Sequence, residues 1–336
     1  MKKRILAFIL CLFFVLGTGM VFAGGQGDSS ASSGKDNFPN RPIKLILPVS
    51  PGGGMDTTAR QWQKFFEAEL GVPLVFESLA GAGTLIGNRA VAQADGDGYT
   101  LGLVSSSDFL FSILTMDAPY KIEDYYWVGV YYSDPSMVWV HKDSPWNTMK
   151  EFTDWVKKQP PKTVPISIPT QTSPNFIQVK NLEKAAGVEF NIIAFSGGNP
   201  ARLAVASKEV VMSTTGVFNG QMIADSCKII GCVDNTNPSP EKSNNAKTVN
   251  EEYGSNVVFP YNFYGLYVPK ALVEKYPQRA EFIAKAFERA INNPDYYAQM
   301  KAIGQEAIID YKNPRDTRKA IEENMKVLES YTEYFK

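Results

Sequence analysis

Residues 44–60 read KLILPVSPGGGMDTTAR and join an apolar run to a glycine-rich loop and a helical pattern. The apolar run at 44–49 has the length and composition of a buried strand. Asp56 is the predicted N-cap of a helix that places Trp62, Phe66 and other apolar residues on one face and stops at Gly71. A strand followed by a glycine loop and a helix start is typical of α/β proteins.

The same order repeats further along the chain. We expect a strand at 74–76, a glycine-rich turn at 81–83, a helix from Thr84 to about Ala94 and a strand at 99–104. A β-α-β-α-β order predicts a parallel sheet with helices on its faces.

A second α/β unit is expected between residues 137 and 257. Its predicted strands lie at 137–140, 163–168, 190–194, 210–212 and 228–231, and its helices begin at Thr148, Ser173, Asn199 and Phe218. A polar loop at 235–247 is followed by a strand at 264–268 and a mainly helical segment to Lys336. The sequence therefore predicts a two-lobed α/β protein, each lobe a mainly parallel sheet flanked by helices. Lobe 1 is residues 38–137 plus about 258–336, and lobe 2 is about 138–257.

The N-terminus has the pattern of an export signal. Lys2, Lys3 and Arg4 precede an apolar run to Leu16, and Val21-Phe22-Ala23 is a small-residue cleavage site. The alternative is a membrane anchor, but a bilayer needs roughly 20 apolar residues and this run is shorter. We predict a signal peptide at 1–23, a flexible Gly/Ser leader at 24–37, and a soluble periplasmic protein after cleavage.

Composition excludes several classes of protein. The chain has 336 residues with 34 Lys plus Arg and 35 Asp plus Glu, and this balance disfavours a nucleic-acid-binding protein. One histidine, His141, and three cysteines leave no multi-histidine or four-cysteine metal site. We expect neither metal nor cofactor. Cys227 and Cys232 flank a predicted strand, which would hold them roughly 16 Å apart, so two free thiols are expected.

Loops at the predicted strand ends form the candidate binding site. Glycines let backbone N–H groups approach a ligand, and a helix N-terminus favours an anion. Neither first-lobe loop contains Lys or Arg, so amide and hydroxyl donors would do the binding. The predicted ligand-binding residues are Ser50, Pro51, Gly52, Gly53, Gly54, Met55, Asp56, Gly81, Ala82, Gly83, Thr84, Ser105 and Ser106 in lobe 1, and Thr172, Ser173, Ser196, Gly197 and Gly198 in lobe 2.

Two features of the predicted site have alternative interpretations. Asp56 is either the helix N-cap or a contact for an amine, which would favour an amino-acid ligand. The aromatic residues Phe109, Phe111, Tyr131 and Tyr132 are either core residues or the far wall of a site for an aromatic acid.

The motifs of common enzymes are missing from the sequence. There is no G-x-S-x-G elbow and no P-loop, and the spacing of Gly81, Gly83 and Gly87 differs from the dinucleotide-binding motif. The only S-x-x-K matches begin at Ser32, in the leader, and at Ser239, in the polar loop. We therefore expect a binding protein and no catalytic residues.

Three stretches carry a resemblance to a known family. FPNRPIKLILPVSPGGGMDTTAR begins at Phe38, LAGAGTLIGNRAVAQADGDGYTL begins at Leu79, and AFSGGNPARLAV begins at Ala194. Together they resemble the substrate-binding proteins of tripartite tricarboxylate transporters, also called Bug proteins. The similarity covers residues 38–336.

The resemblance implies a type II periplasmic binding-protein fold and a small carboxylate ligand, such as a dicarboxylate or tricarboxylate. It also implies delivery to an integral-membrane permease with a large and a small subunit, and it places backbone amides of 50–56 and 81–84 on the carboxylate. We expect a monomer. The alternatives are presentation of the loaded form to a sensor for signalling, or an acidic amino acid or aromatic acid as ligand.

Overall fold

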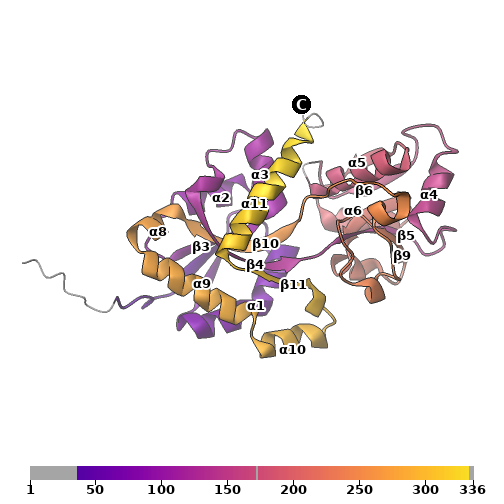
Figure 1. Ribbon diagram of the computed structural model, residues 1–336. Coiled ribbons are helices and arrows are strands. Elements are labelled where there is room, and N and C mark those ends of the chain that lie inside the picture. The colour runs from indigo at the N-terminus through magenta and orange to yellow at the C-terminus, as the bar shows by residue number, and fades with distance from the viewer. Residues whose placement is uncertain (1–35, 172, 333–336) are drawn as a thin grey trace, which may run out of the picture. The chain divides into compact units, whose positions relative to one another are not determined.

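The computed structural model describes residues 36–171 and 173–332 (Figure 1). The chain divides into two units, Met1–Asn37 and Phe38–Lys336. The predicted signal peptide and all but the last two residues of the predicted leader lie outside the described residues. Everything that follows concerns the second unit.

The first of two sheets has six strands in the order β11-β4-β10-β3-β1-β2. Strand β1 (Ile43–Leu47) pairs in parallel with β2 (Leu74–Ser78) and β3 (Thr100–Ser105). Strand β10 (Phe263–Pro269) runs antiparallel between β3 and β4 (Tyr125–Ser133). The short strand β11 (Ile309–Lys312) is antiparallel to β4 at the sheet edge.

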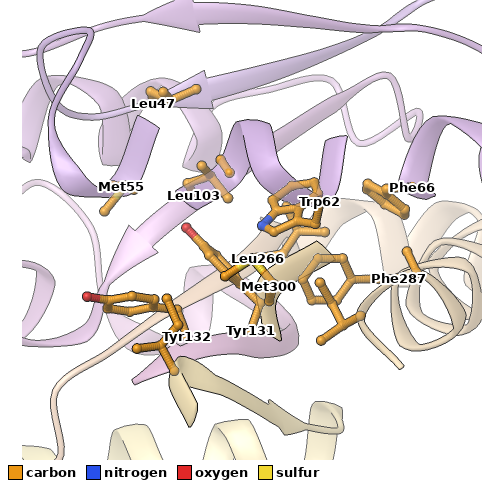
Figure 2. Close-up of a cluster of buried hydrophobic side chains, with 14 of the residues drawn as sticks. Leu47, Met55, Trp62, Phe66, Leu103, Tyr131, Tyr132, Leu266, Phe287 and Met300 are labelled. Carbon is orange, nitrogen blue, oxygen red and sulfur yellow. The ribbon is translucent and has the colours of Figure 1, made fainter. Parts of the chain in front are cut away.

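Helices cover both faces of this sheet. On one face, α1 (Gly54–Leu70) and α9 (Pro277–Ile291) bury Trp62, Phe66 and Phe287 against Tyr131 of β4. The Trp62 ring lies 5.4 Å from the Tyr131 ring and 5.5 Å from the Phe287 ring, and Figure 2 shows these side chains pointing toward one another. On the other face lie α2 (Leu85–Ala92), α3 (Ser106–Thr115) and α11 (Pro314–Glu329) (Figure 1).

The second sheet has five strands in the order β7-β6-β8-β5-β9. These are β5 (Ser136–His141), β6 (Pro165–Ile168), β7 (Asn191–Ala194), β8 (Met212–Gly216) and β9 (Cys227–Cys232). Its helices are α4 (Met149–Val156), α5 (Pro174–Ala186), α6 (Gly198–Ala206) and α7 (Val249–Tyr253). The short helices α8 (Lys270–Lys275) and α10 (Pro294–Ala302) belong to the C-terminal segment.

The prediction of an α/β fold with helix-flanked sheets is confirmed, with antiparallel pairs present beside the parallel ones. Each sheet is mixed, because β10 and β4 run antiparallel in the first and β5 runs antiparallel to β8 and β9 in the second. Strand β4 was not predicted: its sequence YYWVGVYYS is aromatic on both faces and does not alternate. Strand β11 also went unpredicted inside the segment expected to be helical.

Three local predictions need correction. Helix α1 begins at Gly54 with Gly53 as N-cap, so Asp56 is its third residue and not the cap. Helix α6 begins at Gly198 with Gly197 as N-cap, so Asn199 is inside the helix. The helix expected from Phe218 is a 3₁₀ helix at Asn219–Ile223.

Cys227 and Cys232 are free and buried at opposite ends of β9, as predicted. Burial raises the pKa of the Cys227 thiol to about 11 and that of Cys232 to about 12. No helix in residues 36–171 or 173–332 is long and apolar enough to cross a membrane.

Candidate functional site

A cavity of about 710 Å³ is lined by residues from both sheets. Its walls include the loop after β1, the loop after β2, and the turns that precede α5 and α6. Fourteen predicted site residues line it: Ser50, Pro51, Gly52, Gly53, Gly54, Met55, Gly81, Gly83, Thr84, Ser105, Ser173, Ser196, Gly197 and Gly198. The structure therefore brings together loops that are more than 140 residues apart in the sequence.

Ala82, Asp56 and Ser106 do not line the cavity. The buried Asp56 carboxylate accepts a hydrogen bond from the Gly52 N–H at 2.8 Å and pairs with Arg60 at 2.9 Å. The Asp56 carboxylate therefore holds the glycine loop through the Gly52 N–H. The Ser106 hydroxyl is also buried and bonds to the backbone of Tyr261 and Phe263. Thr172 lies outside the described residues.

The N-termini of five helices share one property. The N-caps of α1, α2, α3, α5 and α6 all line the cavity, and none makes a side-chain cap hydrogen bond; they are Gly53, Thr84, Ser105, Ser173 and Gly197. Six α-helices in the described part of the chain begin outside the cavity. The caps of α4, α7, α10 and α11 (Thr148, Thr248, Asn293 and Asn313) accept backbone hydrogen bonds, whereas those of α8 and α9 do not. Uncapped N–H groups and the positive ends of the helix dipoles therefore converge on the cavity.

The loop before α2 has an unusual backbone. Gly81, Ala82, Gly83 and Thr84 all have positive φ values, of 138°, 44°, 58° and 76°. Positive φ is strained for a β-branched residue such as Thr84, and such strain persists only where neighbours hold it. Here Asn88, which is fully buried, donates from Nδ2 to Thr84 Oγ1 at 3.0 Å.

Asn88 is in turn held by three tyrosines. Its Nδ2 also donates to Tyr120 OH at 3.0 Å, and its Oδ1 accepts from Tyr267 OH at 2.8 Å. Tyr125 OH donates to the Asn88 carbonyl at 2.8 Å. This buried network links the strained loop to β4 and β10, so the sheet fixes the position of the loop's N–H groups.

Two stacked tyrosines form another part of the wall. The rings of Tyr132 and Tyr264 lie 4.6 Å apart at an interplanar angle of 10°, and both residues line the cavity. Of the four aromatic residues considered for a far wall, only Tyr132 lines the cavity; Phe109, Phe111 and Tyr131 lie in the core. The interpretation of the other three as core residues is therefore confirmed.

A buried carboxylate lies where the chain passes from β4 to β5. Asp134 is 7% exposed and accepts hydrogen bonds from Tyr132 OH, Asn219 Nδ2, and the N–H groups of Phe218 and Asn219. Burial raises its pKa to about 6, although the four donors oppose this shift. Asp134 therefore joins the first sheet to the 3₁₀ helix after β8.

Arg202 and Asp108 are cavity residues that the sequence analysis missed. Arg202 projects from α6 and donates to Thr215 Oγ1 at 3.1 Å. Asp108 is in the first turn of α3, and burial raises the pKa of its carboxyl while a hydrogen bond from the Ser105 side chain opposes the rise. Arg202 follows directly on the Gly-Gly-x-Pro-Ala motif, which was the available signal for its position.

A second, open cavity of about 550 Å³ lies between β11 and α11. Its lining mixes basic and acidic side chains, including Lys312, Lys319, Asp316 and Glu323. No predicted site residue lines it. Among the described residues, no group of three or more His, Cys, Asp or Glu side chains could hold a metal ion.

Comparison with known proteins places the chain in a family. Residues 58–331 match the family model of the tripartite tricarboxylate transporter family receptor, TctC. The BugT protein of Bordetella pertussis is 31% identical over 193 residues, which are 56% of this chain and 58% of BugT. The alignments with the first curated relatives span 65% or less of those proteins, so the chain covers less than two thirds of their length.

Solved structures show the same fold. MatC of Rhodopseudomonas palustris, with bound malate, matches 89% of this chain and 100% of its own, with a TM-score of 0.69 and 19% identity. A second R. palustris protein, with adipate, matches 89% of this chain and 98% of its own, with a TM-score of 0.73 and 16% identity. The resemblance seen in the glycine motifs is thus confirmed, and the chain belongs to the TctC family of tripartite tricarboxylate transporter receptors, which are solute-binding receptors and not enzymes.

Proposed function

We propose that this protein is an exported periplasmic receptor that binds a small organic carboxylate in the 710 Å³ cavity and delivers it to a tripartite tricarboxylate-type membrane transporter. Membership of the TctC family supports the role in transport. Malate and adipate in two neighbours of the same fold support a carboxylate ligand. The partner we propose is a permease with one large and one small integral-membrane subunit.

The observation that carries the proposal is the set of uncapped helix N-termini in the cavity. Five N-caps that line it leave their first-turn N–H groups without a side-chain acceptor, and carboxylate oxygens are suitable acceptors. Hydrogen bonds to a charged group contribute about 1.5–3 kcal/mol each. Three or four of them would supply the roughly −8 kcal/mol of a micromolar complex.

Binding would draw the two sides of the cavity together. The loops after β1 and β2 belong to the first sheet, and the turns before α5 and α6 belong to the second. We propose that a carboxylate docks first on the N–H groups of residues 52–54 and 81–84. The segments around Ser173 and Gly197 then close over it as lobe 2.

Calorimetry with a panel of acids tests the ligand class. The purified protein is titrated with succinate, malate, adipate, citrate, glutamate and benzoate, after a thermal-shift screen of the same compounds. We expect micromolar binding of a di- or tricarboxylate without turnover. A folded, ligand-free sample that binds none of these acids would contradict the proposal.

An acidic amino acid is a second candidate ligand, and Asp108 is the observation that favours it. Its carboxylate lines the cavity and would accept hydrogen bonds from an ammonium group. Asp56, the residue first considered for an amine, is occupied by Gly52 and Arg60. Tight binding of glutamate with weak binding of glutarate, which lacks the ammonium group, would select this candidate.

Uptake experiments separate transport from signalling. Deletion of the gene should abolish uptake of the radiolabelled ligand identified by calorimetry, and the wild-type gene should restore it. Unchanged uptake together with loss of a ligand-dependent transcriptional response would favour the sensor alternative. N-terminal sequencing of the periplasmic protein tests cleavage after Ala23, and light scattering on the same sample tests the predicted monomer.

A further inference from the structure

Among the described residues that line the cavity, Arg202 is the one with a basic side chain. It is half-buried, and its three hydrogen-bond acceptors are neutral: Thr215 Oγ1, Met222 Sδ and Asn199 Oδ1. A guanidinium group has five N–H donors. Three are used here, which leaves one N–H on each of the two terminal nitrogens.

The described part of the chain supplies no carboxylate within 4.0 Å of the Arg202 guanidinium, although other arginines have such partners. Arg41 pairs with Asp97, Arg60 with Asp56, and Arg289 with Glu69. These three ion pairs are at least partly exposed, where a counter-ion matters least. Arg202 is partly desolvated inside a cavity, where a missing counter-ion costs most.

Asp134 does not serve as that counter-ion. Its charge acts on Arg202 without an ion pair between them. Its two oxygens are already occupied by the four donors from Tyr132, Phe218 and Asn219. The Asp108 carboxyl is held by a hydrogen bond from the Ser105 side chain, and its charge helps to raise the pKa of Tyr264. The Arg202 N–H groups therefore remain available to a ligand.

Arg202 and the glycine loops approach the cavity from different sheets. Arg202 is on α6, which packs against β6 and β8 of the second sheet. The loops at 50–54 and 81–84 follow β1 and β2 of the first sheet. An acid with a single carboxylate can satisfy only one of these two anion-binding groups.

We propose that Arg202 is the residue that selects for a second anionic group on the ligand. This proposal rests on the proposed function. One carboxylate binds the backbone N–H groups of the first-sheet loops, and the other becomes the counter-ion of the Arg202 guanidinium. The ligand thereby bridges the two sheets. A planar, bidentate contact also explains why arginine and not lysine would be required.

The test compares matched acids that differ only in the second carboxylate. Dissociation constants are measured by calorimetry for succinate against butyrate, glutarate against valerate, and adipate against hexanoate. The proteins are wild type, Arg202→Gln, Arg202→Lys and the control Lys208→Gln. Lys208 follows α6, is exposed, pairs with Asp143 and does not line the cavity.

In the wild type, the best diacid should bind at least tenfold more tightly than its matched monoacid. Arg202→Gln should reduce this ratio to less than threefold by weakening the diacid alone, whereas Lys208→Gln should leave it unchanged. Arg202→Lys keeps the positive charge but loses the paired N–H donors of the guanidinium. It should give an intermediate ratio of monoacid to diacid dissociation constants. The midpoint of thermal unfolding of each variant, measured without ligand, controls for folding, and Arg202→Lys retains the test if Arg202→Gln unfolds.

Two results would overturn the proposal while leaving the proposed function intact. One is equal affinity of the wild type for a diacid and its monoacid. The other is an Arg202→Gln variant, folded like the wild type, that weakens both acids by the same factor. Failure of every acid to bind the wild type would instead remove the proposed function itself.

Discussion

Gly216 lies so close to Asp134 that a Cβ added to the glycine would stand 1.9 Å from the carboxylate Oδ2 and 2.1 Å from Cγ. Gly216 is the last residue of β8, and Asp134 is between β4 and β5. Both residues line the cavity. The absence of a side chain at 216 thus allows the buried carboxylate to reach the donors on Phe218 and Asn219.

Gly216→Ala should therefore destabilise the protein, because the Asp134 side chain would have to leave its four donors. We expect a loss of about 2–4 kcal/mol in the free energy of unfolding, measured by urea denaturation. Gly53→Ala is the matched control, since a Cβ there meets only Ser50 O at 3.5 Å. If the clash is the cause, Gly216→Ala should cost little more in a protein that already carries Asp134→Ala.

Gly54→Val should block the cavity without unfolding the chain. A Cβ at Gly54 would stand 3.5 Å from both Asn219 Oδ1 and Tyr264 OH, so the valine methyl groups would enter the space for the ligand. We expect a loss of affinity of about 100-fold, or ~2.7 kcal/mol, by calorimetry. Thr57→Val, exposed one turn further along α1 and outside the cavity lining, is the control. Equal affinity of the Gly54→Val protein and the wild type would place the ligand elsewhere.

Asn88→Leu should weaken both stability and ligand binding. The substitution leaves the hydroxyls of Tyr120 and Tyr267 without their amide partner and releases the strained Thr84. We expect about 2–4 kcal/mol of destabilisation, because buried polar groups would lose their partners. Weaker binding in the part of the population that is still folded would show that the network positions the loop. Ser112→Ala, which contacts Tyr120 without touching Asn88 or the loop, should destabilise but leave the affinity unchanged.

The contribution of Asp134 to the free energy of unfolding should fall as the pH rises from about 4 to about 6. Burial raises the pKa of Asp134 from 3.8 to about 6, so in this range the folded state binds a proton more tightly than the unfolded state. The stability that Asp134 contributes in its protonated form is complete below pH 4 and is lost as the pH passes the folded-state pKa. Relative to Asp134→Asn, the wild type should lose up to about 3 kcal/mol between pH 4 and pH 7.

Asp234 has to be considered in the same measurement. Its pKa is also raised to about 6, mainly by burial and in part by the charge of Asp134. It therefore keeps part of the pH dependence in the Asp134→Asn variant. A difference between wild type and variant that is constant from pH 4 to pH 7 would contradict the assignment to Asp134.

Cys227 and Cys232 should resist thiol reagents in the folded protein. They are 5% and 0% exposed, and burial raises the pKa of both thiols. Ellman's reagent at pH 8 should react slowly with the native protein. In denaturant it should react with both thiols. Absence of reaction in denaturant, reversed by a reducing agent, would instead indicate a disulfide.

The sequence predicts the parallel half of the first sheet because β1 and β2 each end in a glycine-rich loop before a helix and an apolar strand follows. The same rules fail at β4, whose nine residues are nearly all buried and whose pattern therefore does not alternate. Most loop residues of the site follow from their position at strand ends. Arg202 and Asp108 do not, because only the tertiary structure brings α6 and α3 to one cavity.

The position of β10 determines when the first sheet can be completed. Strand β4 is the next strand after β3 in the sequence, but the two strands do not pair with each other. Strand β10, residues 263–269, lies between them in the sheet. All strands of the second sheet come from the continuous stretch 136–232, so that sheet can assemble from its own segment. When the chain is synthesised or exported from its N-terminus, the second sheet can therefore form before β10 is available to pair with β4. Contacts between distant segments form slowly, which makes insertion of β10 the step expected to limit the rate of folding and to leave β3 and β4 exposed to aggregation.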